Sequence, residues 1–464
     1  MNQPLEFGAA ILGGGSAGYA AARTLAAAGR RVAVIEGGEE VGGLCILRGC
    51  MPTKALLWAA EVKHLAEKSA TWGLRPEPLT FHFPAVMARK DAMIADFAGY
   101  RRRQLGDGRF EFIRGTARFV DPHTLALADG RTLRAGHFVI ATGSVVVEPP
   151  LPALKDAGFL TSDDCVRLEK LPRSLIILGG GAIACEFAQF FARFGVAVTL
   201  VQRSPRLLRG FDEDAARVVE AVFRREGIQV FTGTRLLDAR RTSSGRVVVF
   251  EHEGRTQTVE AEAILHALGR TPNTGGLNLP AAGVVTDGGR IVTDAAQRTS
   301  APHIYAAGDC CGPHEIVHVA IQQGEVAARN ILGAGAPREL DDRLLLSVVF
   351  TEPQVAAAGL TEAAARARGI PFVAASHPFN DHGKSMIMDA LDGFVKLLAD
   401  PRTGEILGGA CVGPLGGELI QEVAVAMAAR MTVRQFAAVP HYHPTLAEIW
   451  TYPAEELAEK IPAA

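Results

Sequence analysis

The sequence predicts an α/β protein with two Rossmann-like dinucleotide-binding domains and a separate C-terminal α+β domain. An apolar segment, a Gly-rich loop, a helical pattern and a second apolar segment follow one another at residues 9–36 and again at 174–203. From about residue 345 the pattern changes to short strand-like stretches, with a helical segment near 417–431. A chain of 464 residues is too long for one hydrophobic core, so several domains are expected.

Charge and composition argue against several classes of partner. Forty-eight basic and fifty acidic residues give a formal net charge of −2, which favours neither nucleic acid nor membrane as a partner. The longest apolar tract is interrupted by Glu186, Gln189 and Arg193, so it is not expected to span a membrane. Seven cysteines do not form a secreted disulfide framework, and no signal peptide is visible, so we expect a cytoplasmic protein.

The first Gly-rich loop carries the stronger dinucleotide signal. Gly13, Gly15 and Gly18 fit the pattern G-x-G-x-x-G, in which glycines permit a tight turn, close approach of a pyrophosphate, and packing of helix on strand. The N-terminus of the following helix offers free N–H groups to phosphates. Glu36 closes the second strand, where a carboxylate can accept hydrogen bonds from a ribose diol.

The second Gly-rich loop differs at the end of its second strand. Gly179, Gly181 and Ala184 hold the three loop positions, but the strand runs into Arg203, with Arg209 close behind. Arginines can bind a 2′-phosphate bidentately, whereas a carboxylate would repel it. We therefore predict NADPH in preference to NADH, the alternative being that these arginines are ordinary solvated surface.

Two cysteines four residues apart follow the first dinucleotide unit. Cys45 and Cys50 have no second cysteine or histidine pair nearby, which disfavours a zinc site. A structural disulfide is the alternative, although closing so short a loop stabilises little. A helix beginning after Pro52 would place Cys50 at its N-terminus, where the helix dipole favours a thiolate. A redox pair is the leading interpretation.

The order of these motifs resembles that of the FAD-dependent pyridine nucleotide–disulfide oxidoreductases from about residue 8 to residue 450. A glycine pair, C-x4-C, Pro-Thr-Lys, two Gly-rich loops, "ATG", "GRTPN" and "AAGD" occur in the family's order. The resemblance implies four parts. These are an FAD-binding part (1–148), an NAD(P)-binding domain (149–270), a second FAD-binding or central part (271–344) and a dimerisation domain (345–464).

The resemblance also implies the binding residues. Those assigned to FAD are Gly13, Gly15, Ser16, Ala17, Gly18, Glu36, Gly43, Lys54, Thr142, Gly143 and Asp309. Those assigned to NAD(P) are Gly179, Gly181, Ala184, Glu186, Arg203, Arg209 and Gly269. Lys54 is expected near flavin N5 and paired with Glu186, since a cation there stabilises the charge left by hydride transfer and a buried lysine needs a carboxylate.

The segment "HYHPTLAEIW" is similar to the family's C-terminal signature. Two histidines near a chain end are ordinarily surface or core residues, but the resemblance makes His443 an acid/base and Glu448 the residue that orients it. Thiol–disulfide exchange requires such proton transfer. In the family this pair enters the active site of the other subunit, so we expect a homodimer.

The implied reaction is electron transfer between nicotinamide, FAD, the Cys45–Cys50 disulfide and a small dithiol or disulfide. Cys50 would face the flavin and Cys45 would attack the substrate. We expect an enzyme like dihydrolipoamide dehydrogenase, with a lipoyl-bearing protein as a possible partner. The alternatives are an NADPH-dependent glutathione-type reductase, a mercuric reductase-like enzyme, or a redox-sensing or complex-bound subunit.

Overall fold

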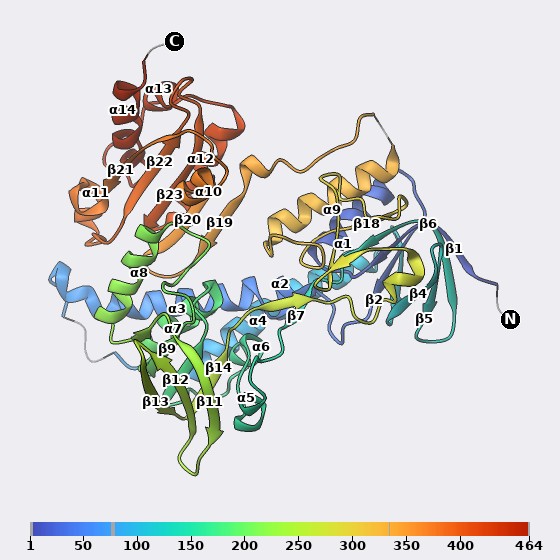
Figure 1. Ribbon diagram of the computed structural model, residues 1–464, viewed down its shortest axis with the longest axis horizontal. Coiled ribbons are helices and arrows are strands. Elements are labelled where there is room, and N and C mark those ends of the chain that lie inside the picture. Colours follow the sequence, from blue (N-terminus) through green and yellow to red (C-terminus); the bar gives the residue numbers. More distant parts are fainter. Residues whose placement is uncertain (1–2, 76–78, 334, 463–464) are drawn as a thin grey trace. The chain divides into compact units, whose positions relative to one another are not determined.

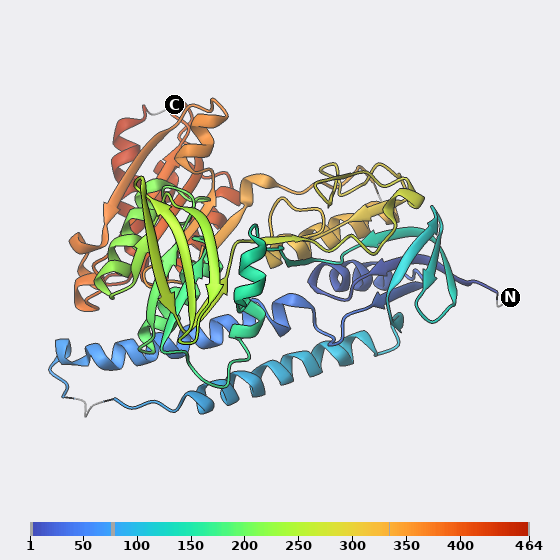
Figure 2. The same ribbon diagram turned by 60° about the horizontal axis from the view of Figure 1, so that its bottom comes forward.

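The computed structural model describes residues 3–75, 79–333 and 335–462, which form two compact units (Figures 1 and 2). Each unit is assembled from three separate stretches of the chain. Unit 1 comprises Met1–Thr53, Met87–Glu148 and Gly269–Leu340, and unit 2 comprises Lys54–Val86, Pro149–Leu268 and Asp341–Ala464. Across the described parts of the chain, no helix combines the length and apolarity needed to cross a membrane.

Unit 1 is built on a seven-stranded sheet with the order β3-β2-β1-β6-β5-β4, and β18 pairs with β6. The pairs among β3, β2, β1, β6 and β18 are parallel, and those joining β6, β5 and β4 are antiparallel. The strands are β1 (Leu5–Leu12), β2 (Val32–Glu36), β3 (Glu111–Arg114), β4 (Ala117–Asp121), β5 (Thr124–Leu127), β6 (Thr132–Ile140) and β18 (Ile304–Ala306). Two small ladders pair β7 (Ser144–Val146) with β15 (Arg270–Pro272) and β16 (Thr286–Asp287) with β17 (Arg290–Ile291).

The sheet of unit 1 is buried on both faces, as parallel sheets are. Alternate residues of β1 enter different cores, with Ile11 on the side of the covering helices and Leu12 on the other side. Helices α1 (Ser16–Ala27) and α9 (Val317–Leu332) lie next to each other (Figure 1). The two helices approach so closely that a Cβ at Gly324 would lie 2.3 Å from the carbonyl oxygen of Ala17.

The stretch Pro149–Leu268 of unit 2 repeats the strand–loop–helix–strand design. Its four-stranded parallel sheet has the order β10-β9-β8-β14 and carries α7, while β11, β12 and β13 form an antiparallel sheet that is prominent in Figure 2. The strands are β8 (Ser174–Leu178), β9 (Ala197–Val201), β10 (Gln229–Phe231), β11 (Arg235–Arg241), β12 (Arg246–His252), β13 (Arg255–Ala261) and β14 (Ala263–His266). The helices are α5 (Pro152–Ala157), α6 (Ser162–Cys165), α7 (Ala182–Arg193) and α8 (Glu213–Arg225).

The last part of unit 2 is a five-stranded antiparallel sheet, β19-β20-β23-β22-β21, drawn in orange and red in Figure 1. Its strands are β19 (Leu346–Val349), β20 (Gln354–Gly359), β21 (Val373–Pro378), β22 (Phe394–Ala399) and β23 (Ile406–Gly413). Its helices are α10 (Glu362–Ala367), α11 (Gly383–Ile387), α12 (Gly416–Ala428), α13 (Val433–Ala437) and α14 (Thr451–Lys460). This is the α+β part expected from the sequence.

A buried lysine links two stretches of unit 2, Pro149–Leu268 and Asp341–Ala464. Lys396 Nζ lies 3.1 Å from Asp212 Oδ2, 2.6 Å from Asp214 Oδ2 and 2.9 Å from Glu362 Oε1. Asp212 also accepts hydrogen bonds from the backbone N–H groups of Glu362 and Ala363, at the N-terminus of α10. Three carboxylates compensate the buried ammonium group, whose pKa is raised despite its burial.

One expected helix begins at a different residue in the structure. Helix α3 (Cys50–Lys68) begins at Cys50 and not after Pro52, because a proline in the first helical turn lacks only an N–H that has no intrahelical acceptor. The position of Cys50 at a helix N-terminus is unchanged by this correction. Helix α4 (Phe83–Leu105) follows α3 in the chain, and α2 (Gly43–Leu47) precedes it.

Candidate functional site

The first Gly-rich loop turns sharply at the end of β1. Gly13 has φ of +106°, and a Cβ there would lie 2.3 Å from the carbonyl oxygen of Ala141. A Cβ at Gly18 would lie 1.9 Å from the carbonyl oxygen of Gly13, so only glycine lets α1 start against the loop. Gly15 is the N-cap of α1 and makes no side-chain cap hydrogen bond. The backbone N–H groups of the first turn of α1, which includes Ser16 and Ala17, are therefore free to donate to a ligand beyond the loop.

Glu36, at the end of β2, is fixed by the same loop. Its Oε2 accepts a hydrogen bond from Gly14 N at 2.9 Å, and its Oε1 accepts one from Gly38 N at 2.7 Å. A carboxylate has about four acceptor positions, so each oxygen keeps capacity for a further donor such as a ribose hydroxyl. Glu36 is thus oriented before any ligand is present.

Unit 1 also contains buried donors that lack acceptors. The Arg101 guanidinium on α4 lies 4.0 Å above the ring of Tyr19 on α1, and burial lowers the pKa of Arg101. Among the described residues, Arg101 Nε and Nη1 and Thr142 Oγ1 are buried with no hydrogen-bond partner. A flavin dinucleotide carries pyrophosphate and carbonyl oxygens that would supply the missing acceptors. Together with the uncapped α1 and the oriented Glu36, these donors fit FAD.

Asp309 is held by residues from two other segments. Ser144 Oγ donates to Asp309 Oδ2 at 2.6 Å, and Arg270 donates to Ser144 Oγ at 2.8 Å and to the Ser144 carbonyl at 2.9 Å. Burial and the neighbouring Asp309 raise the pKa of Glu315. Ser144 follows the "ATG" motif directly and Arg270 lies in "GRTPN", so the motifs contained these two residues although their contact with Asp309 was not predicted.

The cysteine-bearing helix α2 begins against the first Gly-rich loop. Gly43 has φ of +74°, and a Cβ there would lie 2.7 Å from Gly15 Cα. Cys45 lies in α2, and Cys50 is the first residue of α3; both are half-buried. Unit 1 therefore brings the dinucleotide loop and the cysteine segment together, although Gly15 and Gly43 are far apart in the sequence.

Lys54, one turn after Cys50 on α3, forms an ion pair with Glu186 on α7. Its Nζ lies 3.0 Å from Oε1 and 2.9 Å from Oε2. The Glu186 side chain is only 3% exposed, and its Oε1 also accepts a hydrogen bond from Phe350 N at 3.0 Å. Lys54 Nζ lies 4.7 Å above the Phe350 ring. The buried carboxylate is thereby satisfied, and the lysine is held in one place.

The second Gly-rich loop repeats the first in unit 2. Gly179 has φ of +123°, a Cβ there would lie 2.3 Å from the carbonyl oxygen of Ala267, and Gly181 is the N-cap of α7 without a side-chain cap hydrogen bond. Leu208 N donates to the carbonyl of Gly180 at 2.8 Å. This main-chain bond ties the arginine-containing segment 203–209 to the loop.

The residues predicted to bind NAD(P) do not all lie in the same unit. Arg203 and Arg209 are exposed, and no ion pair engages either of them within the described residues. Ala184 is fully buried in α7. Gly269, by contrast, belongs to unit 1, where it has φ of +126°.

The histidine motif near the C-terminus forms a pair. His443 Nδ1 lies 2.9 Å from Glu448 Oε2, and the exposed fractions of the two side chains are 79% and 11%. The neighbouring His441 is occupied elsewhere, with Nε2 2.6 Å from Glu422 Oε1. An exposed imidazole on a buried carboxylate is suited to proton transfer with a substrate.

Comparison with known proteins identifies the family. The family model described as "Pyridine nucleotide-disulphide oxidoreductase" matches residues 7–324, and the model for its dimerisation domain matches residues 345–454. The chain belongs to the pyridine nucleotide-disulphide oxidoreductase family. It is a flavoprotein oxidoreductase that acts on a sulfur group and uses FAD and a pyridine nucleotide. The predicted family and fold class are confirmed, and the dimerisation domain supports a homodimer.

Several individual members of this oxidoreductase family are similar over their whole length. A dihydrolipoyl dehydrogenase of Geobacillus stearothermophilus is 34% identical over 450 residues, covering 96% of this chain and 95% of the relative. A mercuric reductase of Streptomyces lividans is 36% identical over 446 residues, covering 95% and 94%. The solved structure of LpdA from Mycobacterium tuberculosis has a TM-score of 0.87 at 30% identity, covering 98% and 99%. That of the HOCl-induced flavoprotein disulfide reductase RclA from Escherichia coli has a TM-score of 0.86 at 28% identity, covering 97% and 99%.

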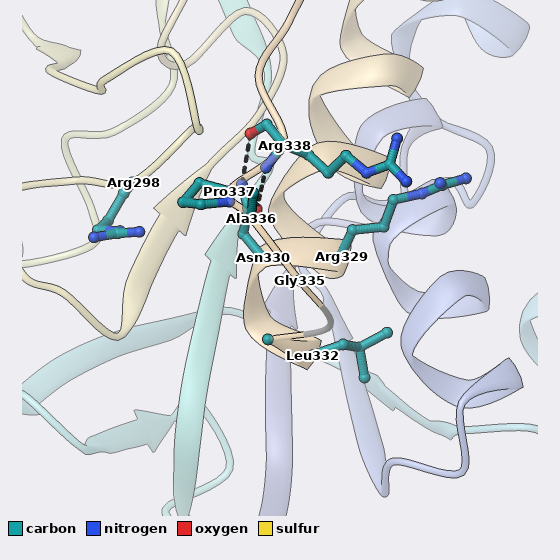
Figure 3. Close-up of a pocket in the computed structure, with 9 residues that line it drawn as sticks. Arg298, Arg329, Asn330, Leu332, Gly335, Ala336, Pro337 and Arg338 are labelled. Carbon is teal, nitrogen blue, oxygen red and sulfur yellow. Dashed lines mark hydrogen bonds between the residues drawn. The ribbon is translucent and has the colours of Figure 1, made fainter.

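A pocket in unit 1 of this oxidoreductase involves none of the predicted site residues. It has a volume of about 330 Å³ and lies at the C-terminal end of α9. Figure 3 shows Arg298, Arg329 and Arg338 around it, with Asn330 holding the backbone of Arg338 through hydrogen bonds of 2.8 and 2.9 Å. The Gly-rich loop and the cysteines line no part of this pocket.

Proposed function

We propose that this oxidoreductase exchanges electrons between NADPH and a small dithiol or disulfide through the Cys45–Cys50 pair, as a dihydrolipoyl dehydrogenase-like enzyme. The observation that carries the proposal is the close approach of Gly43 to Gly15, which sets the cysteine-bearing helix against the dinucleotide loop. Bound FAD would carry the electron pair between nicotinamide and the two sulfurs. Lys54, held by Glu186, would supply positive charge beside the flavin ring.

The two cysteines would act in sequence. The Cys45 thiolate attacks one sulfur of the substrate disulfide, forming a mixed disulfide and releasing a first thiolate, which takes a proton from His443. The Cys50 thiolate then attacks Cys45 Sγ, forming the internal disulfide and releasing the second thiolate. The reverse sequence oxidises a dithiol, and Glu448 holds the imidazole of His443 in either direction.

The substrate class is supported by several relatives that are named dihydrolipoyl dehydrogenase. A lipoyl-bearing protein is accordingly the partner we propose, with the His443–Glu448 pair serving the active site of the other subunit of a homodimer. We retain the four-part division at 148, 270 and 344 and a cytoplasmic location as parts of this proposal.

The coenzyme preference is proposed from the second loop. Arg203 and Arg209 are exposed cationic groups without ion-pair partners among the described residues, on a segment tied to Gly180 by Leu208. A 2′-phosphate could pair with both arginines, which favours NADPH. The kcat/KM values for NADPH and NADH test this, and a large NADH preference would refute it.

A mercuric reductase-like activity is the second candidate. A mercuric reductase is as similar as the dihydrolipoyl dehydrogenases, and a cysteine pair also binds soft metal ions. The deciding experiment assays the FAD-loaded protein with both nicotinamides against lipoamide, glutathione disulfide and Hg(II). Turnover of lipoamide well above the others supports the proposal. Reduction of Hg(II) without disulfide turnover would replace it.

A further inference from the structure

Glu448 faces two histidines, although the sequence motif contains only one of them. Its Oε2 lies 2.9 Å from Nδ1 of His443, and its Oε1 lies 3.4 Å from Nε2 of His382. His443 is exposed, whereas the side chain of His382 is 0% exposed. His382 precedes α11, 66 positions before Glu448 in the sequence, so no local pattern indicates the contact.

The other nitrogen of His382 determines which form of the ring is present. Nδ1 lies 2.8 Å from Oγ of Ser385, which is also buried. A carboxylate can only accept, so a neutral His382 that bonds Glu448 carries its hydrogen on Nε2, and Ser385 then donates to Nδ1. Nε2 makes no hydrogen bond within the described residues, and its contact with Glu448 Oε1, at 3.4 Å, is longer than a well-formed N–H···O bond.

The surroundings of His382 favour its neutral form and hold its ring in place. Its ring packs edge-on against Phe379 and Tyr452, at centroid distances of 6.4 and 6.3 Å. Tyr452 stacks in turn on His377 at 4.0 Å. The titratable groups that face His382 are Glu448, His377, His443 and Tyr452. Burial lowers the pKa of His382, against the attraction of Glu448, which favours the neutral ring.

We propose that His382 is a positioning residue for the proton-transferring pair. In the working enzyme this 3.4 Å contact shortens, so that Nε2 donates to Glu448 Oε1 and keeps Oε2 turned toward His443 Nδ1. The inference rests on the proposed acid/base role of His443. A carboxylate held at both oxygens cannot rotate away when the exposed imidazole gains or loses its proton, so the orientation of His443 persists through the cycle.

The test compares His382→Leu, which removes the donor, with His382→Gln, whose amide can still donate to Glu448. His377→Gln is the matched control, because His377 also packs near Tyr452 but bonds the Asp381 carbonyl and not Glu448. Lipoamide turnover is measured across pH, and flavin reduction by the nicotinamide is measured separately in a single turnover. We expect His382→Leu to lower kcat by at least about tenfold and to change its pH profile. His382→Gln is expected to recover most of the loss, with flavin reduction unchanged in all variants.

If His382→Leu keeps the wild-type turnover and pH profile while His443→Gln is inactive, the inference about His382 is overturned and the acid/base role of His443 stands. If His443→Gln kept full turnover, the acid/base proposal itself would fail and the inference with it. If His382→Leu does not fold, ¹H–¹⁵N spectra of the wild-type holoenzyme, labelled at histidine, determine which ring nitrogen of His382 carries the hydrogen. A neutral His382 ring with its hydrogen on Nε2 supports the inference, and the opposite tautomer overturns it.

Discussion

Lys54 and Glu186 form an ion pair in which both carboxylate oxygens lie within 3.0 Å of the lysine nitrogen. The two residues are 132 positions apart in the sequence, and the lysine is one turn from Cys50 on α3. Glu186 has a second bond to the backbone of Phe350, so the carboxylate cannot follow the lysine if the lysine moves. The pair therefore fixes a cation close to the start of α3, where Cys50 lies.

Replacing this cation should slow hydride transfer. We expect Lys54→Met to reduce the rate of flavin reduction by the nicotinamide about 100-fold, because a positioned charge that stabilises developing negative charge is lost. Stopped-flow reduction of the holoenzyme measures the rate. Lys63→Met on the same helix, where Lys63 pairs with Glu67, is the control. Equal rates in both variants would contradict the role of Lys54.

A site shared between subunits should show complementation. Cys50→Ser and His443→Ala are each expected to abolish disulfide turnover as homodimers. Random exchange of the two inactive proteins leaves one intact site in each mixed dimer, so roughly a quarter of wild-type activity should return. Activity is assayed after exchange is verified with differently tagged chains. No recovery despite exchange would show that each site is built from one chain.

Nucleotide preference should depend on the arginine segment. The double variant Arg203→Ala/Arg209→Ala is expected to lose about 10–100-fold in kcat/KM for NADPH, since charge-assisted hydrogen bonds to a phosphate are removed. The kcat/KM of the double variant for NADH should stay within about twofold of the wild-type value, because NADH lacks that phosphate. Arg217→Ala/Arg224→Ala, which removes two exposed arginines of α8, provides a charge-matched comparison. A parallel loss with both coenzymes would point to a structural defect.

Glu352 should make stability depend on pH. Burial, followed by repulsion from Glu61, raises its pKa to about 7. The folded state thus favours the protonated carboxyl; this contribution is complete below pH 4.5 and is lost as pH rises through 7. Glu352→Gln is always neutral and keeps the backbone bonds to Gln189. Its free energy of unfolding should therefore exceed that of the wild type by about 3 kcal/mol at pH 8–9.

Unfolding free energies of wild type and Glu352→Gln measured at pH 5 and pH 8.5 check this expectation. The two proteins should differ little at pH 5, where the wild-type carboxyl is protonated. Glu169→Gln, at an exposed position, controls for the loss of one negative charge. A wild type that is the more stable protein at pH 8.5 would contradict the prediction.

Two glycines with nearly the same backbone conformation should respond differently to alanine. Gly43 and Gly73 have φ of +74° and +76°, but only the Cβ at Gly43 would meet a neighbour, at 2.7 Å from Gly15 Cα. Gly73→Ala should cost about 1 kcal/mol, the penalty for a left-handed residue. Gly43→Ala should also displace the loop and weaken flavin binding, measured by flavin fluorescence on dilution. Comparable flavin affinity in both variants would argue against the close approach.

Sequence patterns predicted the loops, helices and strands of this molecule, because these features are caused by residues close together in the chain. A glycine such as Gly13 is required by its own backbone angle and by a neighbouring carbonyl, so its spacing is visible in the chain. The contact between Lys54 and Glu186 was expected only through the resemblance to a family, since no periodicity links residues so far apart. His382 was missed because it approaches Glu448 across the fold and lies in no recognisable pattern. Ser144 adjoins a recognised motif, but its contact with Asp309 also spans the fold and was not predicted.

The hydrogen bond from Leu208 to Gly180 has a consequence for how coenzyme choice can change over time. The bond uses only main-chain atoms, so it survives nearly any replacement of the side chains along 203–209. Arginines there can be exchanged for acidic or neutral residues one at a time while the backbone after β9 keeps its course. If the segment selects the coenzyme as proposed, point substitutions alone could then shift the enzyme between the anabolic and catabolic reductant pools, without rebuilding its scaffold.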